Sequence, residues 1–107
     1  MAAMNINSKQ LKEMIEAGKT FLVDFWAPWC PHCRKITDAY NMVAEQYSGV
    51  MDVVKLDMDE SDDLWDELNV ELIPTLRLYV VGKPVDSVVA PESKAAIEEF
   101  IAESLKK

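Results

Sequence analysis

Residues 21–33 read Phe-Leu-Val-Asp-Phe-Trp-Ala-Pro-Trp-Cys-Pro-His-Cys, and this stretch decides the fold. Its first half, Phe21 to Trp26, is a short apolar run rich in aromatic residues, which predicts a buried strand. Beyond the second cysteine, apolar residues recur at three- and four-residue spacing and predict a helix; they are Ile36, Tyr40, Val43, Ala44 and Tyr47. The cysteine pair therefore lies where a strand passes into a helix.

The position of Cys30 at the start of that helix bears on its reactivity. Pro31 follows it at an early helical position, where a missing N–H does no harm. Because unpaired backbone N–H groups and the helix dipole favour negative charge there, we expect the Cys30 thiol to ionise more readily than a free cysteine. Cys33 lies one turn further on, where it can resolve a mixed disulfide. The pattern predicts thiol–disulfide exchange with an exposed Cys30 as nucleophile and a shielded Cys33 as resolving thiol.

Two other interpretations of the cysteine pair stay open. The thiols could be buried neighbours without a redox role, although the helix start and the flanking Trp26 and Trp29 favour redox chemistry. Alternatively, Cys30, His32 and Cys33 could bind a metal. Structural zinc usually takes four ligands, and the sequence has neither a second Cys-x-x-Cys motif nor another histidine. We therefore expect no metal.

Composition and charge restrict the possible functions. The chain has 107 residues, half of them hydrophobic, which suits one domain over residues 1–107. A formal net charge of -8 repels nucleic-acid phosphates, so we expect no nucleic-acid binding. No apolar run approaches the roughly 20 residues of a membrane span, and the first ten residues lack the features of a signal peptide. We expect a soluble, cytoplasmic protein with no membrane association.

The N-terminal half alternates helices and strands. Ser8 can cap a first helix, with Gly18 as its stop, and residues 4–6 can form a short strand before it. An apolar run over residues 51–56 predicts a strand covered on both faces, as in a parallel sheet. Together with residues 21–47, this strand completes a β-α-β unit.

The C-terminal half adds a hairpin between two helices. Ser61 opens a short helix. Residues 76–81 and 85–89 flank Gly82-Lys83-Pro84 and predict the hairpin. A final amphipathic helix begins at residues 91–92 and turns its apolar side chains inward; they are Ile97, Phe100, Ile101 and Leu105. The whole pattern predicts an α/β fold, a central mixed β-sheet flanked by helices on both faces.

The stretch from Val23 to Cys33 resembles the active-site strand and turn of the thioredoxin family, and Ile73-Pro74-Thr75 is similar to its cis-proline loop. Lys55 stands at the family's lysine position, and the resemblance covers nearly the whole chain. It implies a thioredoxin-like fold and a protein-disulfide oxidoreductase that reduces the disulfides of client proteins. It also implies a thioredoxin reductase-like flavoprotein as electron donor, no bound cofactor, and a monomer.

The resemblance assigns further roles around the cysteines. Asp24 must be desolvated within its apolar run, and it looks like a buried proton acceptor for Cys33. Lys55 also lies in an apolar run, so its positive charge would have to be desolvated as well. We expect it to modulate Asp24 through a direct or water-mediated pair, and the alternative is that its side chain snorkels to the surface. Trp26 is expected to pack, and client contact is assigned to Trp29, Ile73, Pro74 and Thr75.

The peptide bond before Pro74 is a specific expectation of this resemblance. A proline at the start of a strand is unusual unless it makes a turn or a cis bond. A cis bond would leave the Ile73 backbone free to pair with an extended client peptide. An ordinary trans proline is the alternative.

The residues between the cysteines depart from the family pattern. Pro31-His32 replaces the usual Gly-Pro and resembles the motif of strongly oxidising periplasmic dithiol proteins. We expect Pro31 to tune the redox properties and a charged His32 to stabilise the Cys30 thiolate, with passive exposure of His32 as the alternative. The substitution leaves a more oxidising oxidase or isomerase as a second function. A third, a binding module with an incidental dithiol, predicts no reduction of insulin disulfides.

Three other departures lie outside the motif. Asp38 replaces a helix-kinking proline, which predicts a straighter active-site helix. Leu72 stands where a small residue is frequent, and Val89-Ala90 replaces a glycine near the active-site surface. We expect both changes to narrow or reshape the client groove.

Overall fold

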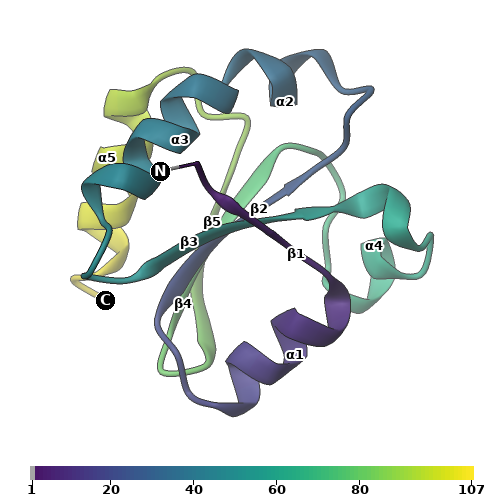
Figure 1. Ribbon diagram of the computed structural model, residues 1–107, viewed down its shortest axis with the longest axis horizontal. Helices are drawn as coiled ribbons and strands as arrows, with labels where there is room; N and C mark the ends of the chain where they lie inside the picture. Colours follow the sequence, from purple (N-terminus) through teal and green to yellow (C-terminus); the bar gives the residue numbers. More distant parts are fainter. Residues whose placement is uncertain (1) are drawn as a thin grey trace.

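A five-stranded mixed sheet forms the centre of the computed structural model, which describes residues 2–107 (Figure 1). The strand order is β1-β3-β2-β4-β5. β3 pairs in parallel with β1 and β2, whereas β4 runs antiparallel to both β2 and β5. The strands are β1 (Met4–Ile6), β2 (Phe21–Trp26), β3 (Asp52–Asp57), β4 (Thr75–Val80) and β5 (Lys83–Val89). The predicted α/β class and mixed sheet are confirmed.

Helices cover both faces of the sheet, as the sequence predicted. The helices are α1 (Ser8–Glu16), α2 (Pro31–Lys35), α3 (Thr37–Gln46), the 3₁₀ turn η1 (Met58–Glu60), α4 (Leu64–Glu67) and α5 (Lys94–Ser104). Leu11 of α1 and Leu64 of α4 pack on one face, whereas Tyr40 of α3 and Ile97 of α5 pack on the other. Figure 1 shows this division, with α2, α3 and α5 on one side of the sheet and α1 and α4 on the other. Among the described residues, no helix is long and apolar enough to cross a bilayer.

The alternation of side chains along β2 determines where Asp24 lies. Successive strand residues point to opposite faces. Phe21, Val23 and Phe25 pack with α1 and α4, while Leu22 packs with α3 and α5. Asp24 therefore lies on the Leu22 side of the sheet, which is the side that carries α2 with the two cysteines.

The active-site helix is broken, so the prediction of a straighter helix was wrong. α2 ends at Lys35 and α3 begins at Thr37, with Ile36 between them at φ -93° and ψ 2°. The Thr37 hydroxyl donates a hydrogen bond of 3.1 Å to the carbonyl of Cys33, four residues back. Threonine bonds of this kind bend helices. A side-chain hydrogen bond therefore accompanies the interruption although no proline is present.

The ends of the first and last helices differ from the sequence prediction. Asn7, not Ser8, caps α1, because its side chain accepts from the backbone of Gln10. Ser8 instead donates its backbone N–H to Glu60. α5 begins at Lys94 with Ser93 as its cap, later than residues 91–92, since the Ser93 hydroxyl accepts from the Ala96 N–H.

Smaller corrections concern the C-terminal half. The predicted inward position of Leu105 was wrong: it follows the last turn of α5 and is half exposed, whereas Ser104 is buried. The hairpin turn is Val81-Gly82, both with positive φ, so β5 already includes Lys83 and Pro84. A Cβ at residue 82 would lie 2.3 Å from the Ile15 carbonyl, so this close approach to α1 requires glycine. The short helix expected to open at Ser61 begins later, at Leu64, as the four-residue α4, and Ser61 instead follows the end of η1.

Candidate active site

Cys30 is the N-cap residue of α2, as the sequence predicted. The backbone N–H of Cys33 donates to the Cys30 sulfur at 3.2 Å, and Pro31 occupies the first turn without losing a hydrogen bond. Both cysteines are free thiols. The expected exposure of Cys30 was wrong, because only 5% of its surface is accessible, against 2% for Cys33. Helix position, more than exposure, therefore distinguishes the two sulfurs.

The loop before β4 lies against Cys30. The Ile73–Pro74 peptide bond is cis, as expected. Antiparallel pairing of Phe25 with Thr75 brings the start of β4 beside the end of β2, where the active-site turn begins. The Cys30 thiol lies 3.8 Å from the Ile73 carbonyl oxygen, which is within reach of a weak S–H hydrogen bond. The pairing of β4 with β2 thus places the predicted client-binding loop next to the Cys30 sulfur.

Asp24 is a buried carboxyl beneath the cysteine pair. It is 4% exposed, and its Oδ1 atom has no hydrogen-bond partner within residues 2–107. Burial raises the pKa of Asp24 to about 7, an effect that the positive charge of Lys55 partly offsets. At neutral pH this carboxyl is therefore divided between its protonated and ionised forms.

The surroundings of Cys33 make its thiol a weak acid. Burial, followed by the hydrogen bond with Cys30, raises the pKa of Cys33 to about 12, and the negative charge of Asp24 adds to the rise. Loss of the Cys33 proton at neutral pH therefore requires a base. Asp24 is a carboxyl whose negative charge acts on this thiol.

Lys55 lies opposite Asp24 in the sheet but does not pair with it directly. The two residues are register partners in parallel strands, so their side chains leave the same face. The Lys55 ammonium instead lies 4.4 Å from the centroid of the Trp26 ring. Among the described residues, no ion pair joins Lys55 to Asp24. Of the direct and water-mediated pairs that the sequence predicted, the direct pair is not formed, and Lys55 makes a cation–π contact in its place.

His32 has a different partner from the one predicted. Its Nε2 atom lies 3.1 Å from the carbonyl oxygen of Pro91, in the loop between β5 and α5. Within the described part of the chain, no hydrogen bond joins His32 to Cys30. The contact was invisible in the sequence because 59 residues separate the two positions.

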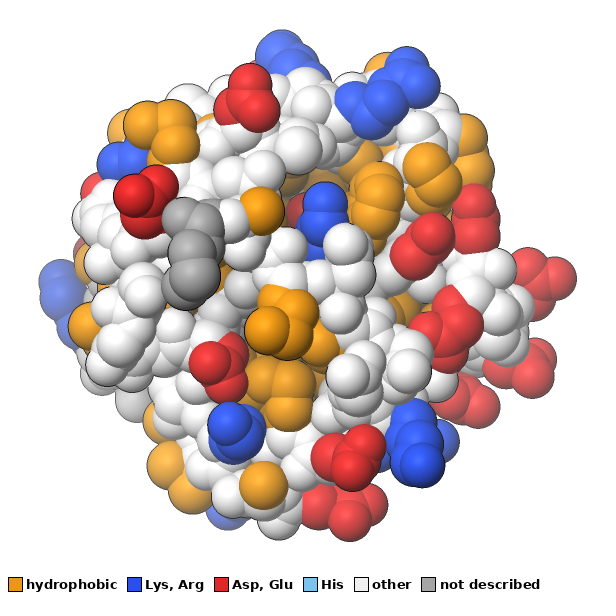
Figure 2. Space-filling view, in the orientation of Figure 1, with side chains coloured by type: hydrophobic (Ala, Val, Ile, Leu, Met, Phe, Trp, Pro, Cys, Tyr) orange, Lys and Arg blue, Asp and Glu red, His pale blue; other side chains and the backbone are white. Residues whose placement is uncertain are grey.

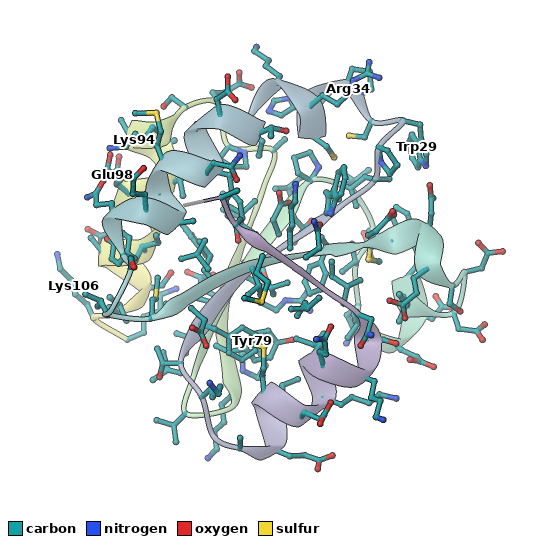
Figure 3. The ribbon with its side chains drawn as sticks, in the orientation of Figure 1. Trp29, Arg34, Tyr79, Lys94, Glu98 and Lys106 are labelled. Carbon is teal, nitrogen blue, oxygen red and sulfur yellow. The ribbon has the colours of Figure 1, made fainter. Side chains whose placement is uncertain are left out.

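Exposed apolar side chains surround the cysteines. Trp29, Leu72 and Val89 are 57%, 63% and 49% exposed. The Trp29 indole N–H donates to Asp59 of η1 at 2.9 Å, a contact that the sequence analysis did not predict. Figure 3 shows Trp29 projecting at the same end of the molecule as Arg34 of α2. Client contact at this end would therefore involve a shallow apolar surface.

The residue beside Val89 adopts the conformation that glycine usually provides. Ala90 has φ +50°, in the left-handed region, and its N–H donates to the Pro74 carbonyl at 2.8 Å. This hydrogen bond joins the end of β5 to the cis-proline loop. An alanine methyl group therefore occupies a position where the family often has no side chain.

The active-site surface is neither a deep pocket nor a metal centre. A groove of about 520 Å³ lies beside β1 and α1, and it is lined neither by the two cysteines nor by the cis-proline loop. Within residues 2–107, no group of three or more histidine, cysteine, aspartate or glutamate side chains is arranged to hold a metal ion. The chemistry that the described geometry supports is exchange between thiols and disulfides, and fold and site together define a thiol–disulfide oxidoreductase.

Comparison with known proteins identifies the family. The thioredoxin family model matches residues 2–103. Thioredoxin 1 of Nostoc sp. is 34% identical over 97% of both chains, and the thioredoxin of Staphylococcus haemolyticus is 36% identical over 98% of this chain and all of its own. The chain belongs to the thioredoxin family. A solved structure of Plasmodium falciparum thioredoxin, 24% identical, shares the fold with a TM-score of 0.83 over 94% of this chain and 98% of that one.

Family membership and the cysteine pair establish the class of reaction. The protein is a protein-disulfide oxidoreductase with a redox-active Cys-x-x-Cys motif, which acts on disulfide-bearing client proteins and receives electrons from a reductase. The comparisons do not favour the more oxidising oxidase or isomerase.

Proposed function

We propose that the protein reduces client disulfides through Cys30 and Cys33 in two exchange steps. The Cys30 thiolate attacks one sulfur of the client disulfide, and the client's second sulfur leaves as a thiolate. The Cys33 thiolate then attacks the Cys30 sulfur, forms the Cys30–Cys33 disulfide and releases the client's first sulfur. Two electrons and two protons pass to the client. The observation that carries this proposal is the N–H of Cys33 directed at the Cys30 sulfur at the start of α2.

Asp24 acts as the proton acceptor for Cys33 in the second step. Efficient general bases have a pKa near the operating pH, and the value of about 7 for Asp24 meets this condition. The pKa of about 12 for Cys33 supports the need for a base in this step. Lys55 modulates Asp24 through its positive charge.

Trp29 and the cis-proline loop receive the client. An extended client segment lies across Ile73, Pro74 and Thr75, with the Ile73 backbone as its hydrogen-bond partner. Trp29, Leu72 and Val89 supply apolar contacts around it. Figure 2 shows acidic side chains gathered around α4, close to the Asp59 that holds Trp29, and this charge favours clients with basic residues beside the disulfide.

Pro31 and His32 adjust the redox equilibrium. Pro31 fixes the first turn of α2 and hence the N–H groups near the Cys30 sulfur. A charged His32 can donate its Nε2–H to the Pro91 carbonyl and still stabilise the Cys30 thiolate through its charge, without direct contact. The electron donor is a thioredoxin reductase-like flavoprotein, and the protein works as a cytoplasmic monomer with residues 1–107 as one domain.

Reduction of insulin disulfides tests this function. With dithiothreitol as the electron source, the wild-type protein should accelerate insulin precipitation, whereas Cys30→Ser and Cys33→Ser should not. Addition of NADPH with a thioredoxin reductase should replace dithiothreitol. An absence of acceleration by the folded wild-type protein would instead support a binding module with an incidental dithiol.

A further inference from the structure

The two neighbours of Lys55 on β2 offer its ammonium group two alternative sites. Asp24 is its register partner, and Trp26 follows two residues later, on the same face of the strand. An ammonium group is attracted both to a carboxylate and to the face of an indole ring. The structure shows the second arrangement, with Nζ 4.4 Å from the Trp26 centroid. In this position the ammonium makes no ion pair with the Asp24 carboxyl among the described residues.

Apart from its burial, the other neighbours of Asp24 leave the position of Lys55 as the main influence on its charge. On β4, its register partner is the apolar Leu76, which supplies neither charge nor hydrogen bond. Within the described residues, the titratable groups whose pKa values are linked to Asp24 are Cys33 from α2, Tyr40 from α3 and Lys55 from β3. The Tyr40 hydroxyl is already committed to the carbonyl of Val54 at 2.6 Å. Lys55 is therefore the cation whose position sets the charge that Asp24 experiences.

We propose that Trp26 is a positioning residue for the proton-transfer step: its indole face holds the Lys55 ammonium away from Asp24, so that the carboxyl stays able to take up the Cys33 proton. Lys55 placed directly on Asp24 would stabilise the carboxylate and make it a weaker base. Trp26 thus does more than pack, and it acts on Cys33 only through Lys55 and Asp24. The proposal rests on the proposed role of Asp24 as proton acceptor.

Substitution of Trp26 tests the proposal through the titration of Asp24 itself. The carboxyl carbon of Asp24, followed by NMR against pH in the reduced protein, reports the titration midpoint whether or not the protein is active. Trp26→Leu removes the aromatic face and frees Lys55 to approach Asp24. We expect the midpoint to move downward by about half a pH unit, the size of a typical cation–π contact. Trp26→Phe keeps an aromatic face and should move it less.

A double-mutant cycle separates this effect from a change in burial. Lys55→Met alone should raise the Asp24 midpoint, because it removes the positive charge. In the Lys55→Met background, Trp26→Leu should no longer lower the midpoint. A downward shift of equal size in both backgrounds would overturn the proposal, since hydration of Asp24 would then explain it. An unchanged midpoint in folded Trp26→Leu would overturn it as well.

Two further measurements complete the test. Should Trp26→Leu not fold, as judged by its amide NMR spectrum, Trp26→Met supplies a longer, flexible apolar side chain without a ring and carries the same expectation. The pH profile of mixed-disulfide resolution should move downward with the NMR midpoint. A moved NMR midpoint with an unmoved resolution profile would contradict the role of Asp24 in the reaction and leave the effect of Trp26 on Lys55 standing.

Discussion

The sulfur of Cys30 lies 3.8 Å from the carbonyl oxygen of Ile73, although the two residues are 43 positions apart in the chain. The nucleophile and the backbone that is proposed to hold the client therefore occupy one small region. A client segment that pairs with the Ile73 backbone would hold its disulfide next to the Cys30 sulfur. Positioning of this kind is a large part of how a reaction between two molecules is accelerated.

The resolving cysteine is identified by trapping. Cys33→Ser should accumulate a mixed disulfide between Cys30 and a client, because the first attack remains possible and the second does not. Mass spectrometry after incubation with oxidised insulin measures the adduct. Cys30→Ser is the matched control and should form none. Trapping by Cys30→Ser in place of Cys33→Ser would reverse the two roles.

The two thiols should react with iodoacetamide at different rates. Below neutral pH, Cys30 should be alkylated first, because its sulfur lies at the N-terminus of α2 and accepts a backbone hydrogen bond there, whereas burial raises the pKa of Cys33 to about 12. Peptide mapping by mass spectrometry after short exposures measures both rates. Their exposed fractions are nearly equal, so equal labelling would show that access alone governs reactivity.

Removal of the buried carboxyl should affect the second exchange step. Asp24→Asn should leave the first attack nearly unchanged and slow resolution on the order of a hundredfold, the usual contribution of a general base. In the wild type, the resolution rate should rise as the pH passes through about 7, where Asp24 loses its proton. Stopped-flow tryptophan fluorescence follows the step. Persistence of this pH dependence in Asp24→Asn would assign it to another group.

The same carboxyl should make stability depend on pH. The pKa of Asp24 is raised from 3.8 to about 7 by folding, so the folded state holds its proton more tightly than the unfolded state. The associated stability is complete below about pH 4 and is lost as the pH rises to about 7, a difference of about 4 kcal/mol. Urea unfolding from pH 4 to pH 8 measures it. Asp24→Asn should remove most of this slope, and an identical slope in both proteins would contradict the assignment.

The charge of His32 should raise the reduction potential. His32→Pro should lower the potential by some tens of millivolts, where about 30 mV corresponds to roughly 1.4 kcal/mol for a two-electron couple. His32→Gln keeps a hydrogen-bond donor for Pro91 and removes the charge, so it should lower the potential in the same direction. Equilibration with glutathione measures both. A potential that changes only in His32→Pro would assign the effect to the contact with Pro91.

Local patterns in the sequence were sufficient for most of the framework. The run from Phe21 to Trp26 forms β2 with those boundaries, because a continuous apolar segment needs cover on both faces. Pro31 indicated the start of α2, since proline fits only the first turn of a helix. The cysteine spacing and the unusual carboxyl at Asp24 were visible as well. Each of these features depends on residues within a few positions of one another.

The details that adjust the chemistry were decided by tertiary structure. The register of β2 against β3 places both Asp24 and Trp26 within reach of Lys55, and the Lys55 ammonium lies over the Trp26 ring. The partner of His32 comes from a loop that only the packing of α5 brings near α2. The interruption at Ile36 depends on which acceptor the Thr37 hydroxyl finds. Sequence periodicity encodes which face of an element is buried, whereas the partner of a polar group depends on distances between elements that form only when the sheet assembles.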